Sequence, residues 1–93
     1  ARERARRSND WGIQLGAFER YAPAHLAATR AARAVPGLLR TRISIMPGRR
    51  KGGRIFRSLL VDMTERKARR ACKRLKRRKL DCIVIQSGKS NSG

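Results

Sequence analysis

Acidic side chains, aromatic side chains and long apolar runs are all scarce in this chain of 93 residues. The six Asp and Glu residues show no pairing, and the single histidine, His25, has no evident partner. The sequence therefore offers no catalytic constellation, and we expect that the chain is not an enzyme. No run approaches the roughly 18 apolar residues of a membrane-spanning helix, so no transmembrane segment is expected.

Basic residues are abundant instead, with 25 Lys and Arg and a formal net charge of +19 at pH 7. Such a surface attracts polyanions, and nucleic acids and anionic cell-envelope polymers remain open as partners. The length predicts one small domain at 10–86, between a disordered basic linker at 1–9 and a flexible tail at 87–93. Because the chain begins at Ala1 and not at Met, we expect a piece of a longer protein. As a fragment, it is expected to be monomeric.

Cys72, Cys82 and one histidine are too few ligands for a zinc site, and no other metal or cofactor is expected. Cys72 falls on the buried stripe of a predicted helix, and Cys82 faces that helix from the following strand. Since the two residues flank a reversal of the chain, we favour a disulfide over the alternative of two buried thiols. Such a bond would persist in a periplasm.

Two strand–helix–strand units, at 11–45 and 54–86, follow one another along the sequence. Strands are predicted at about 11–17, 39–46, 54–61 and 81–86, with a glycine-rich hairpin loop at 47–53. One helix is predicted with Pro23 in its first turn and an end at Pro36-Gly37. Another is predicted at about 66–79 with Thr64 as its N-cap. This order predicts an α+β fold of the βαββαβ type, ferredoxin-like or RNP-like. Its four-stranded antiparallel sheet has strands one and three in the centre and both helices packed on one face.

Alternation within the strands predicts which side chains lie on the helix-free face of this sheet. In the first strand, Trp11, Ile13 and Leu15 are expected beneath the helices. The residues expected on the open face are Gly12, Gln14, Gly16, Arg40, Arg42, Ser44, Ile55, Arg57, Leu59, Ile83 and Ile85.

The first strand, Trp11-x-Ile-Gln-Leu-Gly-Ala-Phe18, resembles the opening signature of the SPOR domain, the sporulation-related repeat that binds bacterial peptidoglycan. The closing half of that family is matched by Ile55-Phe-Arg57, Thr64-Glu-x-x-Ala68, Ala71-Cys72-x-x-Leu75 and Asp81-Cys82-Ile-Val. The cysteine-bearing form resembles the one at the C-terminus of alphaproteobacterial envelope proteins such as D-alanyl-D-alanine carboxypeptidases. Two features depart from the family: Asp62 stands where glycine is usual, and the open face lacks the aromatic residues that some members carry.

The resemblance implies a non-catalytic module in the periplasm or cell envelope that recognises glycan strands stripped of stem peptides. Such a module concentrates its host protein at the cell wall or division septum. Its strand-one glutamine corresponds to Gln14, whose amide suits sugar hydroxyls and N-acetyl groups, and neighbouring backbone is expected to take part. Arginines suit the lactyl carboxylate that muramic acid keeps, and apolar side chains suit sugar rings. The candidate glycan-binding residues are Gln14, Gly16, Ala17, Arg40, Arg42, Arg57, Leu59, Ile83 and Ile85.

Each of these assignments has an alternative, which is that the polar residues are merely solvated and the apolar strip is covered by a linker or tail. The basic outer face of the 66–79 helix is either simply a solvated surface or a surface that weakly attracts anionic wall or membrane polymers. The alternative function is that of a basic RNA- or DNA-binding domain, since RNA-recognition domains have the same topology. RNA-recognition sheets need aromatic residues on the open face, whereas Trp11 and Phe56 are expected on the buried one, so no specific nucleic acid is expected.

Overall fold

A computed structural model of the chain describes residues 9–86. Its elements are β1 (Trp11–Phe18), α2 (Tyr21–Ala34), the short 3-10 helix η1 (Pro36–Leu38), β2 (Arg42–Arg50), β3 (Gly53–Met63), α3 (Glu65–Arg77) and β4 (Ile83–Gln86). Apart from residue 9, the linker predicted at 1–9 and the tail predicted at 87–93 lie outside the described residues. In the described part of the chain, no helix is long and apolar enough to cross a membrane.

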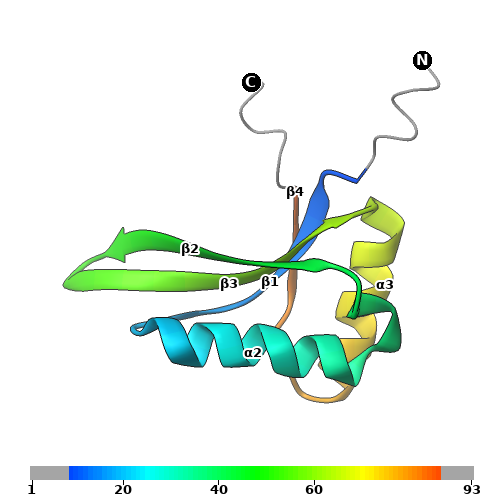
Figure 1. Cartoon of the computed structure of the whole chain (residues 1–93), viewed down its shortest axis with the longest axis horizontal. Coiled ribbons are helices and arrows are strands. Elements are labelled where there is room, and N and C mark those ends of the chain that lie inside the picture. Colours follow the sequence, from blue (N-terminus) through cyan, green and yellow to red (C-terminus); the bar gives the residue numbers. More distant parts are fainter. Residues whose placement is uncertain (1–8, 87–93) are drawn as a thin grey trace.

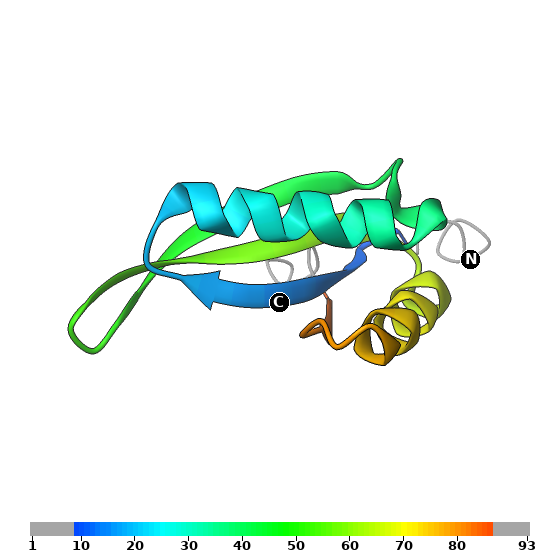
Figure 2. The same ribbon diagram turned by 90° about the horizontal axis from the view of Figure 1, so that it is seen from below.

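The four strands form one antiparallel sheet in the order β2-β3-β1-β4, so β1 and β3 are central. Both helices pack on the same side, and the opposite side of the sheet is free of helices (Figures 1 and 2). The predicted βαββαβ, ferredoxin-like α+β fold is confirmed.

The core lies between this sheet and the two helices. Ile13 of β1 and Leu60 of β3 are fully buried there, against an alanine stripe on α2. The small alanines let α2 approach the sheet closely, and the Ser58 hydroxyl on β3 donates a hydrogen bond to the Ala24 carbonyl at 2.6 Å. The α3 stripe completes the core with Ala68, Ala71, Cys72 and Leu75.

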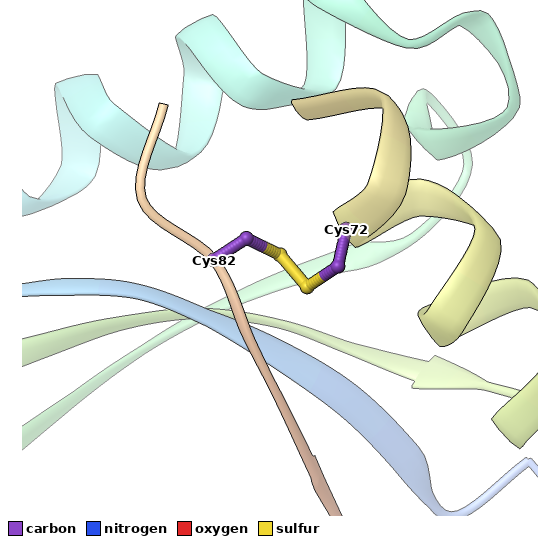
Figure 3. The surroundings of a disulfide bond; sticks show 2 residues. All are labelled: Cys72 and Cys82. Carbon is purple, nitrogen blue, oxygen red and sulfur yellow. A yellow bond between two sulfur atoms is a disulfide. The ribbon is translucent and has the colours of Figure 1, made fainter. Parts of the chain in front are cut away.

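The second helix begins as predicted and is tied covalently to the last strand. Thr64 caps α3, because its hydroxyl oxygen accepts a hydrogen bond from the Lys67 N–H at 3.0 Å. A disulfide joins Cys72 of α3 to Cys82, just before β4, across a Cα–Cα distance of 5.3 Å (Figure 3). The pairing favoured by the sequence is thus present in the structure.

A β-bulge in β1 corrects the face predicted for Gly16. Gln14 pairs with Leu59, but Gly16 pairs with Ser58, so β1 contains one residue more than β3 at Leu15. Because Ser58 points toward α2, Gly16 belongs to the helix side of the sheet, not to the open face.

A second irregularity lies in β3, near its end. Asp62 has a φ of +62°, a left-handed conformation that glycine adopts freely and aspartate tolerates. This explains why glycine suits that position in the family resembled. The neighbouring β1 backbone passes so close that a Cβ on Gly12 would lie 2.5 Å from the Leu60 carbonyl oxygen.

The strands of the β2–β3 hairpin are longer than predicted, and the loop predicted at 47–53 is reduced to a turn at Lys51 and Gly52. Pairing continues to Arg50 and Gly53, and Pro47 lies opposite Phe56 within the ladder. Proline is tolerated here because β2 is an edge strand.

The start of β2 corrects the position of Arg40. The Thr41 N–H and hydroxyl both donate to the Leu38 carbonyl, at 3.1 and 2.6 Å. This closes a turn before the strand begins at Arg42, so Arg40 lies in that turn and not on the sheet.

Candidate functional site

The helix-free face of the sheet brings together Gln14 and several of the other predicted residues. One row across the sheet pairs Ser44 of β2, Leu59 of β3, Gln14 of β1 and Ile83 of β4. Since cross-strand partners share a face and the adjacent Ile13 and Leu60 are buried under the helices, this row faces away from the helices. Gln14 is half-buried and lies in the middle of the sheet.

The next row contains Arg57 at its centre, flanked by Met46 of β2 and Ala17 of β1. The Arg57 side chain is half-buried and reaches across β2. Its Nη1 atom lies only 2.6 Å from where a Cβ of Gly48 would be. The guanidinium therefore lies over the β2 backbone at Gly48. It fits there because glycine has no side chain.

Arg42 is on the same face but does not converge with Arg57. It pairs with Val61, four residues along β3 from Arg57, which separates the two positions by about 13 Å. The Arg42 Nε atom forms an ion pair with the Asp62 carboxylate at 3.2 Å, with both side chains more than half exposed. With Arg40 off the sheet, the predicted arginine cluster becomes two separate cations along one face.

Leu59 was predicted to be part of an exposed apolar strip on this face, but it is only 5% exposed. It lies on the central strand β3, between Ser44 of β2 and Gln14 of β1. Ile55 and Val61 of the same strand are also buried. The apolar surface that remains is at the two edges of the face, where Ile83 is 60% and Met46 is 47% exposed. Ile85 of β4 is half-buried.

Sequence reasoning did not single out Met46 or Gly48 as parts of this face. The alternation of Arg42, Ser44, Met46 and Gly48 carries the signal, but Pro47 and the glycines around it favoured a loop.

A small hollow opens beside Gln14 at the edge between β1 and β4. Its volume is about 280 Å³, and it forms where the pairing of β4 with β1 stops at Gln14. Gly16 and Ile83 both line this hollow together with Gln14. Gly16 is thus near the candidate site, although it belongs to the helix side of the sheet. The full lining is Gln14, Gly16, Lys76, Leu80, Asp81, Cys82 and Ile83.

Within residues 9–86 there is no group of three or more His, Cys, Asp or Glu side chains that could hold a metal ion. The face presents the Gln14 amide, the Ser44 hydroxyl, the Arg42 and Arg57 guanidinium groups and exposed apolar side chains, which are groups that can bind a ligand through hydrogen bonds, charge and apolar contact.

A ferredoxin-like sheet with this polar, helix-free surface defines a small binding module. The sequence matches the family model of the SPOR domain over residues 8–86, nearly the whole chain, and the chain belongs to the SPOR family. Membership implies a non-catalytic, peptidoglycan-binding module of cell-envelope and division proteins. No curated protein and no solved structure matches the chain.

Proposed function

We propose that the helix-free face binds peptidoglycan glycan strands denuded of stem peptides and thereby holds the parent protein in the periplasm at the septal wall. The observation that carries this proposal is the Arg57 guanidinium, which extends from the central strand β3 over the Gly48 backbone of the edge strand β2 on this face. Gln14 lies one row away, with its amide on the same side.

The proposed contacts follow from the chemistry of the denuded strand. Removal of the stem peptide leaves the lactyl carboxylate of muramic acid free, and a guanidinium can bind a carboxylate through two parallel hydrogen bonds. The Gln14 amide both donates and accepts, which suits hydroxyl and N-acetyl groups. Ile83 and Met46 provide exposed apolar contact for sugar rings at the edges of the face.

An RNA-binding role for the same face has less support. Recognition of RNA on such a sheet uses exposed aromatic side chains for base stacking. Here Phe56 lies on the helix side, where its ring makes an edge-to-face contact with Tyr21 of α2 at a centroid distance of 6.1 Å. Trp11 likewise packs against the buried core.

The test is cosedimentation with sacculi treated with an amidase, which removes stem peptides, and with untreated sacculi, at about 0.15 M salt. Wild-type chain is expected to be retained on the treated sacculi. Arg57→Ala should weaken retention by about 10- to 100-fold, because a hydrogen-bonded charged group contributes roughly 1.5–3 kcal/mol. Gln14→Ala should weaken it by a smaller factor.

Arg54→Ala is the matched control, since Arg54 lies on the same strand but on the opposite side of the sheet from Arg57. It removes the same charge and should leave retention unchanged. Unchanged retention of Arg57→Ala would contradict the proposed site. Equal loss of sacculi and of RNA with rising salt would show that net charge alone drives binding.

A further inference from the structure

The outer surface of α3 is the most strongly charged part of the molecule, and the candidate glycan site does not use it. Ala68, Ala71, Cys72 and Leu75 turn toward the sheet, which leaves the remaining positions of the helix and the turn after it in solvent. Ten of these positions are basic, and all but the half-buried Lys67 are exposed: Arg66, Lys67, Arg69, Arg70, Lys73, Arg74, Lys76, Arg77, Arg78 and Lys79.

The chain cannot neutralise this surface by itself. Its sequence contains six Asp and Glu side chains, fewer than these ten cations, so several of the cations would lack an acidic side chain as partner even if all six were placed there. One acid lies on the helix, Glu65, which binds Arg69 at 2.7 Å. Asp62 is directed to Arg42 on β2. The excess charge therefore remains available to an external anion.

A cavity of about 440 Å³ lies between α3 and the segment that contains η1. Its floor is apolar, with the buried Val35, Leu38 and Ala71. Four cations surround this floor: Arg66, Lys67, Arg70 and Arg74. The next residue after η1, Leu39, is 65% exposed. Cations and an exposed apolar side chain are thus presented together.

We propose that this surface, formed by the outer face of α3 and the η1 segment, docks on a bilayer containing anionic phospholipids. Phosphodiester head groups would lie among the arginines of the cavity, and Leu39 would contact the boundary between head groups and acyl chains. A nucleic acid would match the charge but not the exposed leucine. The chain's four aromatic residues, Trp11, Phe18, Tyr21 and Phe56, are all outside α3 and η1, so base stacking is not available there.

The docking surface and the candidate glycan site point in opposite directions. The helix α3 lies on the side of the sheet opposite to the face that carries Gln14 and Arg57 (Figures 1 and 2). One of its basic residues, Lys76, lines the hollow beside Gln14, and the cations of the η1 cavity, Arg66, Lys67, Arg70 and Arg74, do not. Lipid binding is therefore independent of glycan binding and can be measured separately.

The test is cosedimentation of the whole chain with vesicles of equal parts phosphatidylglycerol and phosphatidylcholine, and with pure phosphatidylcholine, at about 0.15 M salt. Binding is expected to the anionic vesicles alone. The triple variant Arg66→Gln, Arg70→Gln, Arg74→Gln should bind them on the order of 100-fold more weakly, from about fivefold per arginine near the surface. Its retention on amidase-treated sacculi should stay at the wild-type level.

A matched triple variant, Arg49→Gln, Arg50→Gln, Arg54→Gln, makes the same change in net charge at the hairpin, the opposite end of the molecule from α3 (Figure 1). It should keep vesicle binding within severalfold of wild type. Leu39→Ser should weaken binding to vesicles but not to an RNA oligonucleotide. Equal losses in the two triple variants would overturn the proposal, because they would show that net charge alone acts. Tighter binding to the oligonucleotide than to vesicles, lost in the α3 variant, would overturn it in favour of a nucleic acid.

Discussion

Gly48 controls the position of the side chain on which the proposed glycan site depends. The Arg57 guanidinium lies over the Gly48 backbone, with Nη1 2.6 Å from the position of a Cβ there. Any side chain at this position must displace the guanidinium. Because the displaced atoms are the end of a flexible side chain, the displacement affects the site more than the fold.

We expect Gly48→Val to lower retention on amidase-treated sacculi as much as Arg57→Ala does. Its free energy of unfolding should stay within about 1 kcal/mol of wild type, since valine suits a strand better than glycine does. Cosedimentation and thermal unfolding measure the two effects. Gly53→Val is the control, because no atom lies within 4 Å of a Cβ at that position. Full retention of the Gly48 variant would show that Arg57 binds from another position.

At this scale, the sequence predicted the candidate site only where strict alternation holds. Gln14 and Arg57 are on the expected face, because the alternation of side chains between the two faces is regular along β1 up to Gln14 and along β3 around Arg57. The bulge at Leu15 moves Gly16 to the other face. A glycine inside a strand, here with φ of +149°, often marks a bulge, but strict alternation does not take that signal into account. Leu59 was placed on the correct face, but its burial depends on neighbours from two other strands, which a single strand pattern does not contain.

Among the elements, α3 could be predicted best, because its determinants are local in the sequence. Its cap at Thr64 and its stripe of buried residues lie within about three turns of one another. The β2–β3 hairpin was predicted worst, because Pro47 and nearby glycines favour a loop in isolation. They are accommodated in a strand because the sheet order places β2 at an edge, a fact of topology and not of local sequence.

The link between α3 and β4 leads to a prediction about stability. The Cys72–Cys82 disulfide closes a loop with a sequence separation of 10, which corresponds to roughly 2–3 kcal/mol by the chain-entropy estimate. The double variant Cys72→Ser, Cys82→Ser should lose about that much free energy of unfolding, measured by chemical denaturation. Reductant should destabilise wild type by a similar amount and leave the double variant unaffected.

Titration of free thiols in denatured, unreduced protein provides the complementary measurement. It should detect no thiol in wild type, because both cysteines are paired in the structure. Two thiols per chain, together with insensitivity of the unfolding midpoint to reductant, would contradict the disulfide.

For the whole molecule, a formal net charge of +19 on 93 residues opposes compactness through self-repulsion. Raising sodium chloride from about 0.01 to 0.15 M shortens the screening length from about 30 to 8 Å and should therefore stabilise the fold. We expect a rise of about 1 kcal/mol, or roughly 4–8 °C in Tm, by thermal unfolding. The α3 triple variant, with lower charge, should show a smaller rise. An unchanged or falling Tm in wild type would show that charge repulsion does not limit stability.

The order of the strands has one more consequence, which concerns crowding. One border of the sheet is β2, where Pro47 offers no N–H and Arg49 and Arg50 repel their counterparts, and the other border, β4, is only four residues long. Neither border is a good template for a strand from another copy. We therefore expect that copies at high local concentration do not associate through intermolecular strand pairing.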